Sequence, residues 1–110
     1  MIKEVYISVD VETAGPIPGK NALLSIGACL VEKPSCSLYI ELQPDKMEVM
    51  AEAMAIHGLS MENLKNNGKL PAEAMQIFEN WIKKVVAKDQ QPIFVALPTI
   101  KEYIDAFQNN

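Results

Sequence analysis

Apolar and polar residues alternate along the first part of the chain with a period of two, which predicts β-strands. Residues 4–10 form the first such run, and residues 23–32 and 35–43 form two more. A tight turn at Lys33-Pro34 separates the second run from the third. Three consecutive strands with short connections predict an antiparallel meander. The apolar face of the first strand is formed by Val5, Ile7 and Val9.

The pattern changes to helical spacing in the second half of the chain. Residues 47–57 are rich in Met, Ala and Glu and predict a helix, and Ser60 is placed to cap a short one after it. Residues 71–88 form the clearest helix, with a proline in the first turn and apolar residues at helical spacing. Residues 92–97 predict a short strand that runs parallel to its partner, because a helix crosses over to reach it. From Pro98 onward we expect one more helix and a polar tail.

This order of elements predicts an α/β fold with a mixed sheet and a right-handed crossover. The chain has 110 residues, which suits a single domain covering residues 1–110. Apolar residues make up 49% of it, but no run of about 18 apolar residues exists, which excludes a membrane-spanning helix. No signal-peptide pattern follows Met1, so the expected location is cytoplasmic.

The charge composition of the chain argues against some classes of function. Ten basic residues, all of them lysine, stand against 14 acidic ones, giving a net charge of −4. A protein that grips a long duplex through many phosphates usually has a basic surface, often rich in arginine. The composition therefore argues against a high-affinity duplex binder. It leaves room for an enzyme that holds a few phosphates through metal ions.

Two carboxylates stand close together where the first strand gives way to a loop. Asp10 and Glu12 are two positions apart, so both side chains point to the same face while the strand continues. Residues 13–21 hold two glycines and two prolines and predict a loop. Adjacent carboxylates repel each other, and a divalent cation offsets that repulsion. The alternative is a strand end whose acids face water, and spacing alone leaves both interpretations open.

Four segments in order carry a resemblance to a known family. The run Asp10-Val11-Glu12-Thr13, followed by Leu24-Ser25-Ile26-Gly27-Ala28, resembles the first motif of the DEDD 3′–5′ exonucleases. Residues 55–60 are similar to the family's segment before the crossover helix, and residues 92–96 to the strand that enters the second acidic motif. This family includes polymerase proofreading subunits, oligoribonuclease and ribonuclease T. The resemblance implies a ribonuclease H-like fold: three antiparallel strands, a crossover helix and a parallel fourth strand.

The resemblance also implies a chemistry, the hydrolysis of phosphodiesters from the 3′ end of a single-stranded nucleic acid by two divalent ions, Mg²⁺ or Mn²⁺. Asp10 and Glu12 match the family's catalytic carboxylates, which hold the metal ions. Thr13 matches a position that approaches the 3′-terminal nucleotide. For the further metal ligand of the second motif, the chain offers Glu102 and Asp105, both outside the family's usual pattern.

The third motif, with its histidine or tyrosine and its final aspartate, has no counterpart before Asn110. The resemblance therefore implies an incomplete, C-terminally truncated domain with impaired catalysis. The family's site holds two metal ions, and this domain is expected to hold two, one or none. A homodimer is expected to cover the exposed sheet edge. For His57, the chain's single histidine, we expect a structural hydrogen bond. The alternative function is a catalytically inactive binding or dimerisation domain.

Overall fold

A mixed sheet with helices on its flanks forms the part of the chain that the computed structural model describes, residues 3–96. The strands of this part are β1 (Lys3–Thr13), β2 (Leu23–Leu30), β3 (Ser37–Glu41) and β4 (Gln90–Val95). Its helices are α1 (Ala51–His57), α2 (Met61–Asn67) and α3 (Pro71–Val85).

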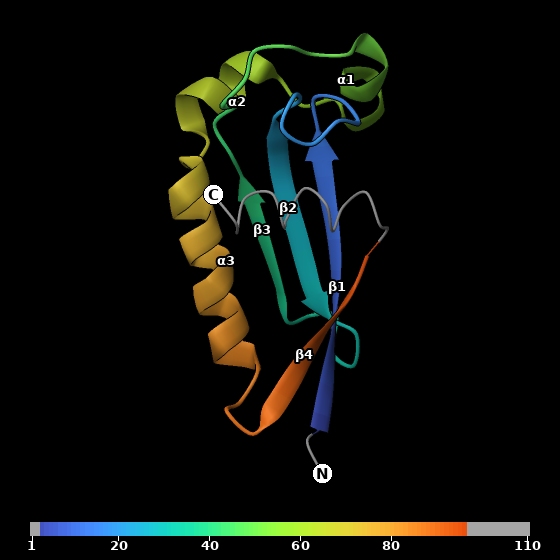
Figure 1. Cartoon of the computed structure of the whole chain (residues 1–110), viewed down its shortest axis with the longest axis vertical. Helices are drawn as coiled ribbons and strands as arrows, with labels where there is room; N and C mark the ends of the chain where they lie inside the picture. The colour runs from blue at the N-terminus through green and yellow to red at the C-terminus, as the bar shows by residue number, and fades with distance from the viewer. Residues whose placement is uncertain (1–2, 97–110) are drawn as a thin grey trace.

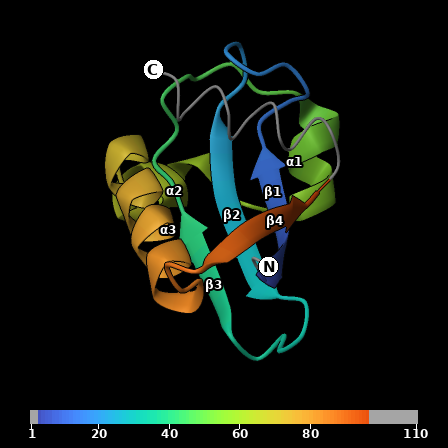
Figure 2. The same ribbon diagram turned by 60° about the horizontal axis from the view of Figure 1, so that its bottom comes forward.

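The strands lie in the order β3-β2-β1-β4. β1, β2 and β3 form an antiparallel meander, and β4 pairs in parallel with β1 after the chain has crossed over through α3. In the ribbon views, α3 runs beside β3 and α1 lies near the end of β1 (Figures 1 and 2). The mixed sheet and the parallel fourth strand that the sequence predicts are confirmed.

The main core fills the space between α3 and one face of the sheet. Ile7 and Val9 of β1 are fully or almost fully buried there against Phe78 of α3. The Phe78 ring also meets the Phe94 ring of β4 edge-on, with 6.3 Å between the ring centres. Burying a side chain of this size stabilises the fold by about 1.5–3 kcal/mol. Because successive strand residues point to opposite faces, this packing places the even-numbered residues of β1 on the face away from α3.

Two predicted boundaries of the first strand and helix are wrong for identifiable reasons. β1 continues to Thr13, so the acidic pair lies within the strand and not at its end. The helix predicted from residue 47 begins at Ala51. Met50 is extended, with φ −106° and ψ 125°, because its N–H donates to the carbonyl oxygen of Ala14 over 2.7 Å. This bond draws the chain before α1 onto the loop that follows β1.

Other ends differ by a few residues. β2 stops at Leu30 and β3 starts at Ser37, so the turn is longer than predicted. α3 ends at Val85, because the next residue is extended, with φ −116° and ψ 118°. The predicted stop at Gly58 is confirmed, since that glycine has a φ of 68° and caps α1 in the left-handed conformation. The Ser60 cap is also confirmed, its hydroxyl accepting the Asn63 N–H over 3.2 Å.

Some expectations fall outside the described residues. The helix predicted from Pro98 belongs to this group, as do the two candidate ligands Glu102 and Asp105. Within residues 3–96, none of the helices has the length and apolar character needed to cross a membrane.

Candidate functional site

The face of the sheet opposite α3 carries the acidic pair. Asp10 and Glu12 share this face because Val9 and Val11 turn toward the core. Strand register sets their neighbours. Asp10 pairs with Gly27 and Glu12 with Ser25, and residues paired in this way project on the same side.

The register continues onto β3. Gly27 pairs with Tyr39, and Ser25 pairs with Glu41. Two parallel rows therefore cross the meander on this face. The first row is Asp10, Gly27 and Tyr39, and the second is Glu12, Ser25 and Glu41.

A β-bulge ends the pairing beside the acidic pair. Glu12 is paired with Ser25 but Thr13 with Leu23, so Leu24 is an extra residue on β2. The Leu24 side chain is fully buried in a second apolar cluster, where it packs with Leu64 of α2. Bulges bend a strand and are common next to active sites. Here the bulge fixes the direction in which the chain leaves β1, one residue after Glu12.

The acidic pair opens onto a cavity of about 270 Å³. Asp10 is exposed and Glu12 is half-buried, so both carboxylates are accessible to a solute. Side chains of all three meander strands and the segment after α1 enclose the space. The residues that line it include Asp10, Glu12, Gly27, Tyr39, His57 and Leu59. The structure thus brings the two predicted catalytic carboxylates into one cavity.

The donor set in this cavity suits part of a metal site. Asp10 and Glu12 offer carboxylate oxygens, which are the ligands that Mg²⁺ and Mn²⁺ prefer. Among residues 3–96, no group of three His, Cys, Asp or Glu side chains is arranged to hold an ion. A magnesium ion is commonly held by one or two carboxylates, with water and substrate phosphate completing its shell. The described residues therefore fit an ion that is bound together with substrate.

His57 ties the segment after α1 to the end of β1. Its Nδ1 accepts the Leu59 N–H over 3.0 Å, so Nδ1 carries no proton and Nε2 is the donating nitrogen. Nε2 lies 3.1 Å from the carbonyl oxygen of Thr13. Both ring nitrogens are thus used within the protein. The structural hydrogen bond that we predicted for this histidine is present.

Thr13, the predicted contact of the 3′-terminal nucleotide, has its polar groups engaged. Its hydroxyl donates to the carbonyl oxygen of Gly15 over 2.7 Å, and its own carbonyl accepts from His57. Thr13 is not one of the residues that line the cavity. The structure therefore gives it a role in holding the strand end and the loop after it.

The loop of residues 14–22 is built around one buried asparagine. Asn21 accepts the Ile17 N–H through its side-chain oxygen over 3.1 Å and is only 3% exposed. A Cβ on Gly15 would lie 2.5 Å from that side chain, so only glycine fits there. The backbone closes the loop with a bond of 2.9 Å from the Ala14 N–H to the Ala22 carbonyl. The loop that borders the acidic pair is therefore fixed by its own contacts.

Sequence reasoning missed Tyr39 and Glu41. The Tyr39 hydroxyl donates to Glu41 Oε2 over 2.8 Å. Burial raises the pKa of Tyr39, as do the hydrogen bond and negative charge of Glu41 and the charge of Glu12, while a hydrogen bond with Ser25 lowers it. The alternation of residues 37–41 places both side chains opposite the buried Ile40. Their position beside the acidic pair follows only from the register of β3 on β2.

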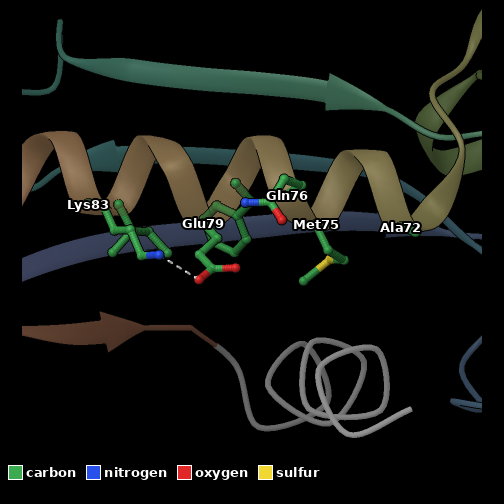
Figure 3. Close-up of a pocket in the computed structure, with 7 residues that line it drawn as sticks. Ala72, Met75, Gln76, Glu79 and Lys83 are labelled. Carbon is green, nitrogen blue, oxygen red and sulfur yellow. Dashed lines mark ion pairs between the residues drawn. The ribbon is translucent and has the colours of Figure 1, made fainter.

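A second cavity, of about 500 Å³, lies along α3 (Figure 3). Its wall includes Met75, Gln76, Glu79 and Lys83. Glu79 and Lys83 pair with each other, with 2.9 Å between Oε1 and Nζ. This cavity holds one carboxylate, already neutralised by a lysine. The smaller cavity at Asp10 and Glu12 is the better candidate for chemistry on a phosphodiester.

Comparison with known proteins finds an exonuclease among the relatives of this chain. The chain is 46% identical over 93 residues to the 3′–5′ DNA exonuclease Cap18 of Escherichia coli. The matched segment is 84% of this chain but 50% of that protein, so the chain spans about half the length of this relative. No protein-family model matches the chain.

Solved structures of exonuclease I share the fold. The product-bound form matches with a TM-score of 0.75 at 14% identity, over 98% of this chain and 26% of the other. The zinc-bound complex of the Escherichia coli enzyme with single-stranded DNA matches with a TM-score of 0.74 at 15% identity, over 98% of this chain and 24% of the other. At such identities the matches show the fold alone. They confirm the predicted ribonuclease H-like arrangement.

Proposed function

Because this chain is a relative of the 3′–5′ exonucleases, we propose that it is a divalent-metal-dependent 3′–5′ exonuclease domain that acts on single-stranded nucleic acid. The observation that carries the proposal is the position of Asp10 and Glu12, side by side on the open face of the sheet and lining one cavity. We further propose that this chain acts with reduced activity on its own. Two carboxylates of residues 3–96 reach the cavity, and a two-metal site needs more ligands than two.

Asp10 and Glu12 act as the metal ligands in this proposal, with Mg²⁺ or Mn²⁺ as the ion. A bound divalent ion activates water and stabilises the departing oxygen of the phosphodiester. The two carboxylates would hold the ion at the open face of the sheet, where Asp10 is exposed and Glu12 half-buried. Glu102 and Asp105 are proposed as further ligands from outside the described residues.

Thr13 is the proposed neighbour of the 3′-terminal nucleotide. Its hydroxyl proton is already donated to Gly15, so contact with substrate is through the methyl group or the backbone. His57 supports this strand end through the Thr13 carbonyl and takes no part in proton transfer. Rigid support of this kind keeps reacting groups in the geometry that a displacement at phosphorus requires.

A cleavage assay tests the proposal. A single-stranded oligonucleotide labelled at its 5′ end is incubated with the protein in Mg²⁺, in Mn²⁺ and in EDTA. We expect a ladder that shortens from the 3′ end in either metal and stops in EDTA. Asp10→Asn, which keeps the shape and removes the charge, should abolish the ladder. Glu32→Gln removes an equal charge from the exposed turn after β2 and should leave the ladder unchanged.

Two results would overturn the enzyme proposal. One is cleavage that persists in Asp10→Asn or in EDTA, which would place the activity elsewhere. The other is the absence of cleavage in both metals. If the protein then still binds the oligonucleotide in a metal-dependent way, the alternative function is supported, that of a binding domain without catalysis. The lack of a third acidic ligand among residues 3–96 favours that alternative.

A homodimer through β4 is part of the proposal. β4 is the last strand in the sheet order, and its outer side pairs with no other strand of residues 3–96. Edge strands present unpaired N–H and C=O groups that a second chain can join. Sedimentation equilibrium should give twice the chain mass of 12.2 kDa. A monomer at micromolar concentration would contradict the dimer and leave the exonuclease proposal intact.

A further inference from the structure

Gly27 stands in the middle of β2, between Asp10 and Tyr39 in the first row of the open face. Glycine weakens a strand interior relative to alanine, and its presence there often marks a close approach by a ligand or another backbone. A Cβ built on Gly27 meets only the Asp10 carbonyl oxygen, at 3.8 Å, which is ordinary contact. Its φ is not positive, unlike that of Gly19 and Gly58. Neither conformation nor crowding requires glycine at this position.

Other glycines of the chain are required by close packing. A Cβ on Gly15 would lie 2.5 Å from Asn21, and one on Gly68 would lie 2.5 Å from the backbone of Leu42. Gly27 has no comparable neighbour within the described residues. The absence of a side chain at Gly27 leaves open space at the base of the cavity, between the acidic pair and the Tyr39 ring. We call this space the floor of the cavity.

The Tyr39 ring forms the opposite wall of this floor. It is 61% exposed, so most of the ring surface is open to a ligand. The hydroxyl is held by Glu41 over 2.8 Å, so the ring is fixed at its outer end as well as at its backbone. A rigid, exposed aromatic surface is the kind of platform on which bases of single-stranded nucleic acids stack.

Charge decides which part of a nucleotide fits here. Glu12 and Glu41 flank Ser25 in the neighbouring row, so the space beside Tyr39 is negative. A phosphate would be repelled there, while a neutral base would not. A phosphate is favoured only where a metal ion neutralises Asp10 and Glu12. The cavity measures about 270 Å³, below the roughly 300–1,000 Å³ of pockets for drug-sized ligands, so it suits one nucleoside.

We propose that Gly27 and Tyr39 form a nucleobase subsite beside the metal carboxylates, in which one base of the bound strand lies over Gly27 and stacks on the Tyr39 ring. The subsite rests on the proposed exonuclease function, because it needs a strand whose phosphodiester lies at Asp10 and Glu12. Gly27 keeps the floor open for the base, and Glu41 holds the ring in place. The subsite selects single strands, since a base in a duplex has no free face to offer.

Binding of a fluorescent single-stranded oligonucleotide, followed by anisotropy in Ca²⁺, tests the subsite without turnover. Tyr39→Ala removes the ring, and Tyr39→Phe keeps the ring but loses the bond to Glu41. Tyr6→Ala is the matched control, because Tyr6 is also exposed and its hydroxyl contacts the carboxylate of Glu4 two residues away, over 3.5 Å. Tyr6 lies outside the cavity.

Gly27→Val and Gly27→Ala fill the floor to different extents. Cys29→Val is the control for Gly27→Val, since it places the same side chain two residues along the same face of β2 and outside the cavity. Thermal unfolding of each variant reports whether the fold is kept. Gly27→Ala serves as the second variant should Gly27→Val fail to fold, because its Cβ meets no close neighbour.

The expected result is a loss of affinity without a loss of stability. Tyr39→Ala should weaken binding roughly 5- to 150-fold, the range measured for one stacked base. Tyr39→Phe should retain most of the affinity. Gly27→Val should weaken binding while Gly27→Ala unfolds at the wild-type temperature or above it. Both control variants should bind as the wild type does.

Binding that survives Tyr39→Ala and Gly27→Val, in a wild-type protein that does bind, would overturn the subsite and leave the exonuclease proposal standing. A parallel loss of stability and affinity in Gly27→Ala would also overturn it, because glycine would then serve the fold. Failure of the wild type to bind or cleave any single strand would overturn the proposed function itself. These outcomes are distinguishable in one set of measurements.

Discussion

The His57 imidazole donates from Nε2 to the carbonyl oxygen of Thr13 over 3.1 Å, across 44 residues of sequence. Its Nδ1 accepts the Leu59 N–H over 3.0 Å. One side chain therefore joins the last residue of β1 to the segment that leaves α1. The acidic pair stands directly before this junction, so the hydrogen bonds of His57 determine how firmly the end of the site is held.

His57→Phe should destabilise the protein. The change removes both hydrogen bonds and leaves the Leu59 N–H and the Thr13 carbonyl without their partner, which costs about 1–3 kcal/mol of unfolding free energy. Urea unfolding measures this loss of unfolding free energy. Ile56→Ala is the control, because Ile56 is the neighbouring residue and is 83% exposed, so its change should stay within about 0.5 kcal/mol. Loss of activity at unchanged stability would instead assign His57 to the chemistry.

Sequence patterns were sufficient to predict the strands and helices that bury one face and expose the other. The alternation around Ile7 and the apolar spacing in α3 reflect a single core, so they predicted the sheet and the crossover helix. The predicted start of the first helix, at residue 47, was wrong because helix propensity reflects only local sequence. A tertiary bond from the Met50 N–H to Ala14 overrides it there.

The candidate site was predictable only in part. Asp10 and Glu12 lie on one strand, so their shared face follows from spacing alone. Tyr39 reaches the same cavity, with Glu41 beside it on the same face, through pairing across two strands. A shift of one residue in that register would turn both side chains to the other face. Register of this kind depends on turn length, and the turn between β2 and β3 is longer than its sequence indicated.

Gly15→Ala should destabilise the loop beside the site more than Gly19→Ala does. The new Cβ on Gly15 would lie 2.5 Å from the Asn21 side chain and would displace it from the Ile17 N–H. Gly19 has a φ of 84° but open space around it, so alanine there costs only the left-handed conformation, about 1–2 kcal/mol. Urea unfolding of both variants measures the difference.

A double variant isolates the cause of the Gly15 effect. Asn21→Ala removes the obstructing side chain, so Gly15→Ala should cost less in that background than in the wild type. Additive losses would show that the steric conflict is not the reason. In that case the backbone conformation of the loop would be the determining factor.

Stability should fall in alkaline solution as Tyr39 ionises. Its pKa is raised in the folded protein, so the contribution of this group to stability is fully present below about pH 10 and is lost as pH rises through the folded-state pKa. The near-ultraviolet absorbance of tyrosinate follows the titration directly. Tyr39→Phe should remove the tyrosine that titrates at elevated pH, and Glu41→Gln should bring its titration closer to the ordinary range. Burial, the larger cause of the raised pKa, stays in Glu41→Gln, so the pKa should remain somewhat raised. An unchanged titration curve in this variant would contradict the contribution assigned to Glu41.

Metal binding should reverse the sign of the effect of Asp10 on stability. Without metal, the carboxylates of Asp10 and Glu12 repel each other, so Asp10→Asn should raise the unfolding temperature slightly. With Mg²⁺ or Mn²⁺ at 100 times its dissociation constant, the wild type should gain about 2.7 kcal/mol, because the ion binds the folded state. Asp10→Asn should lose that gain, whereas Glu32→Gln should keep it. Calorimetry with and without EDTA measures both effects. An equal response to metal in Asp10→Asn and in the wild type would remove the acidic pair from the metal site.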